Sequence, residues 1–126
     1  MMEEGIRHTF PKEEKLCGKT SIELLIARGK YHTASPLRCC FLAENGQEHS
    51  RMMVSVPKKF FKRAVKRNLL KRRIRECWRK QKHMIPEGHH IDILFTYASK
   101  EVSDYGTIYE SVGSILNQIS KNIKAK

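Results

Sequence analysis

The stretch VKRNLLKRRIRECWRK, residues 65–80, constrains the fold of this chain more than any other part of it. It contains eight lysines or arginines and a single acid, Glu76, yet apolar side chains recur through it. The apolar residues that keep the i, i+4, i+7 and i+8 spacing of one helical face are Leu70, Ile74, Cys77 and Trp78. Because a disordered basic tail gains nothing from such a face, the stretch predicts a helix over about residues 59–82 with that face packed on a sheet.

A second stripe of the same helix lies about 135° round the cylinder from the apolar one. Its members, spaced i, i+3, i+4, i+7 and i+11, are Asn68, Lys71, Arg72, Arg75 and Arg79. Cations at such spacings repel one another, and each pair costs roughly 0.2–0.5 kcal/mol, which the single Glu76 cannot offset. Ordinary surface helices interleave acids with bases, so this stripe indicates a surface for a polyanion. Its arginines favour phosphate oxygens in particular.

The charge of the whole chain is concentrated in this segment. The 126 residues include 25 Lys and Arg and 13 Asp and Glu, a formal net charge of +12. Residues 57–82 hold 13 of the bases and one of the acids, so the other 100 residues are balanced at 12 of each. Charge focused in this way is typical of a nucleic-acid contact. A leucine zipper is excluded because Pro86 and Gly88 end the helix, and a helix-turn-helix because a strand pattern follows. A membrane-lying helix fits less well because Trp78 belongs in the core.

The sequence before the basic helix predicts one further helix and two strands. An amphipathic helix ends at Gly29, and residues 35–44 and 50–58 have the composition of strands. The loop between these strands contains Asn-Gly, which predicts an antiparallel hairpin with Gly46 in the left-handed conformation.

The sequence after the basic helix predicts a buried strand over residues 89–99 and a closing helix over residues 104–123. The apolar face of that helix consists of Ile108, Val112, Ile115, Leu116 and Ile119. Together the elements predict a single α+β domain with two or three antiparallel strands before the basic helix. Asp92 and Asp104 stand apart from each other, and we expect them to be solvated or to cap a helix.

The four cysteines and six histidines show no metal-ligand spacing. Cys39 and Cys40 are neighbours, so they point to opposite faces of a strand and make poor joint ligands. We therefore expect reduced, partly buried thiols. The first residues contain no apolar signal-peptide core, and no apolar run reaches membrane-spanning length. These features predict a cytoplasmic protein without a membrane contact.

Residues 64–78 resemble the signature helix of the bacterial ribonuclease P protein family. The residues that match the signature are Ala64, Arg67, Asn68, Leu70, Lys71, Arg72, Ile74, Arg75 and Trp78. The preceding SVPKK is similar to the strand end of that family, through Ser55, Val56, Lys58 and Lys59. The first helix also resembles its counterpart, which ends in glycine at the position of Gly29. The order of elements agrees over about residues 12–119.

The resemblance implies a fold like the second domain of ribosomal protein S5, in the order α-β-β-β-α-β-α, with a left-handed crossover through the basic helix. It implies one domain over residues 1–126, with an ordered core at about 12–119 and short flexible ends. It implies the RNA-binding residues Lys58, Lys59, Lys62, Arg63, Lys66, Arg67, Asn68, Lys71, Arg72, Arg75 and Arg79. The third member of the family's Arg-Asn-Arg triplet is Leu69 here, so that RNA contact is missing or moved.

The implied partners are the catalytic RNA of ribonuclease P and precursor tRNA, with no obligate protein partner. The RNA removes the 5′ leader with Mg²⁺ that is bound mainly by the RNA and the substrate. The protein supplies no catalytic residue and no metal ligand, and acts by positioning and charge neutralisation. The implied leader-binding cleft consists of Ile22, Ile26, Cys40 and Ser55. The family usually has aromatic rings at the positions of Ile22, Ile26 and Cys40, so we expect a weaker leader contact without ring stacking.

Two other functions remain open from the sequence. A ribosomal or ribosome-assembly protein would share the basic helix and would co-purify with ribosomal RNA instead. A self-sufficient nuclease would have to cleave precursor tRNA without an RNA subunit. His89 and His90 are the only residues that suggest such a nuclease, and adjacent histidines are more often a surface feature.

Overall fold

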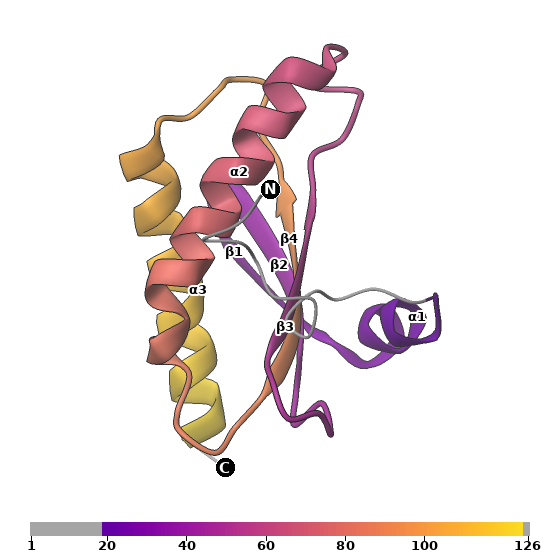
Figure 1. Cartoon of the computed structure of the whole chain (residues 1–126), viewed down its shortest axis with the longest axis vertical. Coiled ribbons are helices and arrows are strands. Elements are labelled where there is room, and N and C mark those ends of the chain that lie inside the picture. Colours follow the sequence, from indigo (N-terminus) through magenta and orange to yellow (C-terminus); the bar gives the residue numbers. More distant parts are fainter. Residues whose placement is uncertain (1–18, 125–126) are drawn as a thin grey trace, which may run out of the picture.

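The computed structural model describes residues 19–124 and shows the elements in the predicted order (Figure 1). They are α1 (Lys19–Arg28), β1 (Lys30–Ala34), β2 (Leu37–Ala43), β3 (Arg51–Ser55), α2 (Ala64–Gln81), the 3₁₀ turn η2 (Lys82–Met84), β4 (Ile91–Tyr97) and α3 (Tyr105–Lys124). The α+β class is therefore confirmed. Residues 12–18 of the predicted core, with Cys17, lie outside the described residues.

The four strands form one sheet in the order β1-β2-β4-β3. β4 pairs antiparallel with β2 and parallel with β3, and α2 makes the crossover between β3 and β4. The predicted hairpin of residues 35–44 with 50–58 is therefore wrong, because β4 lies between these strands; the antiparallel hairpin is β1–β2. The reason is burial: Ile91, Ile93, Phe95 and Tyr97 of β4 are all fully buried, which favours a central strand. Gly46 does adopt the left-handed conformation, with φ of 75°.

Two helices cover one face of the sheet and one helix covers the other. Figure 1 shows α2 and α3 on one side and α1 on the opposite side. Ile74 and Trp78 are completely buried, as predicted, and Trp78 meets Phe95 of β4 edge-on, with ring centroids 6.1 Å apart. The predicted apolar face of α3 is likewise completely buried. None of the helices within residues 19–124 is long and apolar enough to cross a membrane.

The basic helix is shorter than predicted at its start. α2 begins at Ala64, whereas the sequence predicts a start near residue 59. The difference arises because Phe61 is buried against Tyr97, with ring centroids 5.8 Å apart, and this contact holds the preceding residues in a turn. The N–H of Phe60 donates to the carbonyl of Pro57 at 3.2 Å within that turn. Lys58, Lys59, Lys62 and Arg63 consequently lie ahead of the helix and not along it.

The two isolated acids have different roles. Asp104 caps α3, since its carboxylate accepts the N–H of Thr107 at 2.8 Å, as predicted. Asp92 is only 3% exposed, so the prediction that it is solvated or caps a helix is wrong. It accepts hydrogen bonds from Arg51 at 2.8 and 2.6 Å and from Asn45 at 2.8 Å. The parallel register places Arg51 beside Asp92, and only the strand order reveals that pairing.

Three cysteines are buried free thiols: Cys39, Cys40 and Cys77. Burial raises the pKa of Cys39 to about 12 and that of Cys77 to about 11. A thiol with so high a pKa stays protonated near neutral pH and is a poor nucleophile or metal ligand. The prediction of reduced, buried thiols is confirmed for these three residues.

Candidate nucleic-acid interface

The apolar stripe of α2 fixes the helix so that its cationic side faces outward. Leu70, Ile74, Cys77 and Trp78 are completely buried against the sheet and α3. Asn68, Arg72, Arg75 and Arg79 are exposed, and Lys71 is half-buried. The two predicted stripes therefore exist, and their different environments follow from the helical period alone.

Several cations of α2 are engaged within the protein. Arg67 donates to the carbonyls of Phe61 and Lys62 at 2.7 and 2.9 Å, so it holds the turn before the helix. Arg73 donates to the carbonyl of Ser103 at 2.6 Å, which ties α2 to the segment before α3.

Arg79 and Lys80, near the end of α2, are also engaged. Arg79 forms an ion pair with Glu76, in which its Nε donates at 3.1 Å, and this pairing raises the pKa of Arg79. The ammonium group of Lys80 lies 5.7 Å from the centre of the Tyr105 ring. The cations on the α3 side of the helix, Arg73 and Lys80, therefore contact other parts of the protein and have a structural role.

A second group of cations has no partner within residues 19–124. These are Lys62, Arg63, Lys66, Lys71, Arg72 and Arg75. α2 also has no acid in its first turn, and Arg63 at the N-cap makes no side-chain capping bond. Uncapped N–H groups at a helix start attract anions. The start of α2 and the flank that carries Lys71 and Arg75 together form a surface suited to the phosphates of a nucleic-acid backbone.

A cavity of about 340 Å³ lies beside the start of α2. It is lined by Phe60, Phe61, Lys62, Arg63, Lys66, Lys100 and Val102. Lys59 adds a further cation, with its ammonium group 5.1 Å from the centre of the Phe60 ring. Lys100 lies outside the basic segment, in the connection between β4 and α3, so sequence reasoning missed it. Only the fold brings it to the other cations.

On its other face, the sheet packs against α1 through a small apolar cluster. Leu25 and Cys40 are its buried members, and Ile22, Leu42, Met53 and Leu94 pack around them. The Cys40 thiol donates to the carbonyl of Leu25 at 3.4 Å. At Gly29 a Cβ atom would come within 2.4 Å of that carbonyl and 2.5 Å of the Cys40 sulfur. Gly29 therefore allows the close approach of α1 to β2.

The four predicted leader-cleft residues all lie on or beside this face, with unequal accessibility. Ile26 is 53% exposed, and Ile22 and Ser55 are half-buried. Cys40 is 4% exposed because α1 covers it, so its side chain has no surface to offer a ligand. The role of the other three in leader binding stays a prediction.

Two exposed side chains on the same face were missed by sequence reasoning. Tyr31 of β1 is 65% exposed and pairs across the strands with Cys40. Arg38 of β2 is exposed and pairs with Thr33. Partners in register point to the same face of a sheet. The short segment 30–34 has no distinct strand pattern in the sequence, so only the register identifies these positions.

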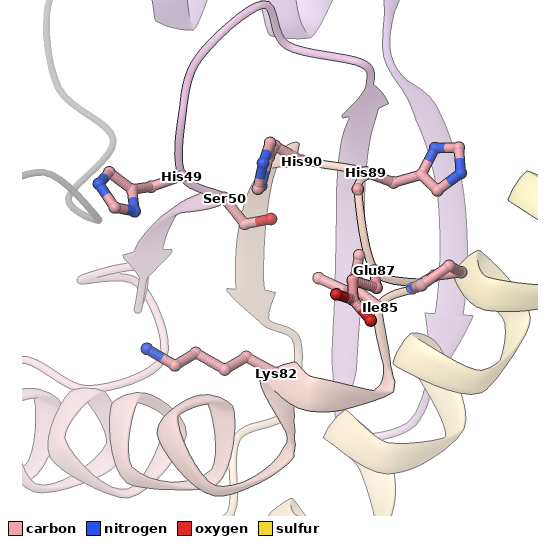
Figure 2. Close-up of a pocket in the computed structure, with 9 residues that line it drawn as sticks. His49, Ser50, Lys82, Ile85, Glu87, His89 and His90 are labelled. Carbon is pink, nitrogen blue, oxygen red and sulfur yellow. The ribbon is translucent and has the colours of Figure 1, made fainter.

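The histidines that suggested a nuclease do not converge on one point. A cavity of about 280 Å³ is lined in part by His49, Lys82, Glu87, His89 and His90 (Figure 2). Figure 2 shows the His89 ring directed away from both His90 and His49. His89 Nδ1 instead lies 2.5 Å from a carboxylate oxygen of Glu44.

Within residues 19–124 no three His, Cys, Asp or Glu side chains come together as metal ligands. The contact between His89 and Glu44 is the one side-chain pairing of the two adjacent histidines within the described residues, and it does not include His90.

Comparisons with known proteins all find similarity to ribonuclease P proteins. A family model described as Ribonuclease P matches residues 10–120. The ribonuclease P protein component of Porphyromonas gingivalis is 34% identical over 119 residues, which cover 89% of this chain and 87% of the relative. That of Thermotoga maritima is 30% identical over 117 residues, with 88% and 96% covered.

Solved structures of ribonuclease P proteins share the fold. The structure from Thermotoga maritima superposes with a TM-score of 0.71 at 29% identity, covering 83% of this chain and 96% of the other. A structure from Staphylococcus aureus superposes with a TM-score of 0.70 at 22% identity, covering 86% and 95%. The second likeness concerns the fold alone.

Proposed function

The chain belongs to the ribonuclease P protein family, and we propose that it is the protein subunit of a bacterial-type ribonuclease P. In this proposal it binds the catalytic RNA and the 5′ leader of precursor tRNA, and so assists removal of the leader. The RNA subunit carries the chemistry. The protein would act in the cytoplasm, where precursor tRNA is made.

The observation that carries the proposal is the sorting of the charges on α2. The cations on the α3 side are engaged with Ser103 and Tyr105, whereas Lys66, Lys71, Arg72 and Arg75 have no partner in the described part of the chain. A rigid row of unpaired guanidinium and ammonium groups suits an RNA backbone of defined shape. Each phosphate that such a row neutralises releases counterions, which makes binding favourable and dependent on salt.

The proposal leaves Mg²⁺ to the RNA and the substrate. The described residues offer no cluster of ligands for it, since Asp92 is committed to Arg51 and Asn45. Bound to the RNA, Mg²⁺ would supply the charge that polarises the scissile phosphate and lowers the pKa of a water. The protein contributes by reducing the repulsion between substrate and RNA backbones, so that less Mg²⁺ is needed to bring them together.

A ribosomal or ribosome-assembly role is the other candidate. The basic helix alone would fit it equally well, but the family match over residues 10–120 favours ribonuclease P. RNA that co-purifies with the protein distinguishes the two, because a ribosomal protein would retain ribosomal RNA.

The direct test is cleavage of precursor tRNA by a bacterial ribonuclease P RNA at low Mg²⁺, with and without this protein. We expect strong stimulation by the parent and a much weaker one by the double variant Arg72→Ala with Arg75→Ala. Lys121→Ala with Lys124→Ala is the matched control, because it removes two exposed positive charges from the end of α3. Equal stimulation by the two double variants would contradict the assignment to α2, and no stimulation by the parent would contradict the proposed function.

A further inference from the structure

The β1–β2 hairpin carries an aromatic ring and a guanidinium group on the sheet face that α2 and α3 do not cover (Figure 1). Tyr31 is paired with Cys40, and Thr33 with Arg38. Tyr31 and Arg38 are therefore diagonal neighbours on one face, and their backbones lie about 7–8 Å apart in such a pair. Both side chains are exposed.

The Tyr31 ring is held at its hydroxyl end and open over most of its surface. Its hydroxyl donates to the carbonyl of Ile26 at the end of α1 at 3.5 Å. A contact with the Cys40 thiol raises the pKa of Tyr31, so the hydroxyl stays neutral and keeps its proton for that bond. The side chain is nevertheless 65% exposed. A ring tethered at one edge with a free surface is suited to stacking.

Arg38 has no such tether in the described structure. Its cross-strand neighbours on this face are Thr33 on one side and Thr96 on the other, and neither is an acid. No hydrogen bond or ion pair occupies its guanidinium group within residues 19–124. A guanidinium group surrounded by hydroxyls can bind a phosphate by two parallel hydrogen bonds without competition from a carboxylate.

We propose that Tyr31 and Arg38 form a subsite for one unpaired nucleotide of single-stranded RNA, with the base stacked on Tyr31 and its phosphate bound by Arg38. The long Arg38 side chain starts one diagonal step from Tyr31 and can reach toward the phosphate of a nucleotide whose base lies on the ring. Single-stranded RNA is the occupant because a base in a duplex has no free face to offer.

The nucleotide is assigned to the 5′ leader, and in this respect the inference rests on the proposed function. The hydrogen bond from the Tyr31 hydroxyl to the carbonyl of Ile26 places Tyr31 beside the end of α1, where Ile26 of the predicted leader cleft is also exposed. Helix α2, to which the catalytic RNA is assigned, lies on the side of the sheet opposite to α1 (Figure 1).

The test uses the full chain assembled with a bacterial ribonuclease P RNA and precursor tRNA that carries 2-aminopurine at successive leader positions. Stacking quenches the fluorescence of this base. We expect quenching at one leader position with the parent, its loss with Tyr31→Ala and its retention with Tyr31→Phe. Tyr31→Ala should also weaken binding of leader-bearing precursor by at least about fivefold while leaving mature tRNA unchanged.

Arg38 is tested by salt dependence. Arg38→Ala should lower the log–log slope of leader binding against salt by about 0.7, and Arg38→Lys should restore most of it. Leu24→Ala is the control, because Leu24 is an exposed apolar residue of α1 outside the cluster on the sheet. It should change neither quenching nor slope.

The outcomes separate this inference from the proposed function. Quenching that persists in Tyr31→Ala, or a loss of mature tRNA binding as large as that of precursor, overturns the subsite. If the parent complex does not distinguish precursor from mature tRNA, the proposed leader function fails instead. In that case a short single-stranded RNA containing 2-aminopurine, titrated onto the protein alone, decides the subsite: loss of quenching in Tyr31→Ala supports it, and equal quenching overturns it.

Discussion

Replacement of Trp78 by alanine tests the idea that the sheet anchors the basic helix. Trp78 is completely buried and lies edge-on against Phe95. A buried tryptophan removes roughly 200 Å² from water, which at about 25 cal/mol per Å² contributes about 5 kcal/mol. That figure is an upper bound, because the unfolded chain already shields part of this area and alanine keeps a small part of it; the cavity adds back some of the cost. We therefore expect Trp78→Ala to lower the free energy of unfolding by about 3–5 kcal/mol.

Trp78→Phe provides the comparison that identifies the cause. No acceptor within residues 19–124 reaches the indole N–H of Trp78, which is buried. An unsatisfied buried donor costs about 1–3 kcal/mol, and phenylalanine removes that donor while it keeps a ring against Phe95. The loss of volume and the gain from removing the donor oppose each other, so we expect Trp78→Phe to cost no more than about 1.5 kcal/mol.

The assay is urea unfolding followed by circular dichroism, because both variants lack the only tryptophan of the chain. The midpoint and the slope together give the free energy of unfolding. Fluorescence of the parent should show a buried indole. An alanine variant as stable as the parent, or a phenylalanine variant as unstable as the alanine one, would refute the reasoning.

Three further predictions concern the interface and the buried ion pair. Arg72→Ala with Arg75→Ala should leave stability nearly unchanged and lower the log–log salt slope of RNA binding by about 1.4–1.8, and an unchanged slope would exclude them as phosphate contacts. Ile22→Phe with Ile26→Phe should strengthen binding of leader-bearing precursor and not of mature tRNA, because aromatic rings stack on bases; equal effects on both RNAs, or an Ile22→Asp variant that keeps the leader effect, would place the leader elsewhere. Asp92→Ala should lower the free energy of unfolding by about 3–5 kcal/mol, measured with urea, since it removes the buried carboxylate that accepts hydrogen bonds from Arg51 and Asn45. A loss below about 1 kcal/mol would show that water replaces the carboxylate.

The sequence by itself determined the elements whose signal is local. The two stripes of α2 and the apolar face of α3 follow from a period of 3.6 residues, and both are present in the structure. The burial of Trp78 and the capping role of Asp104 depend on residues near them in the chain, and these were also predicted correctly.

Strand order and the partners of single residues were decided by tertiary structure. The Asn-Gly loop of residues 45–49 suggested a hairpin, but the apolar strand β4 gains more by lying between β2 and β3 than these strands gain by pairing with each other. That insertion buries Asp92 beside Arg51.

The side chains that share the exposed face of the β1–β2 hairpin could not be predicted from the sequence either. Which face Tyr31 and Arg38 share is set by a register between strands, and β1 is too short to display its own period. The physical reason is that helical periodicity repeats within one segment, whereas a strand shows its inner and outer faces only after its neighbours are known.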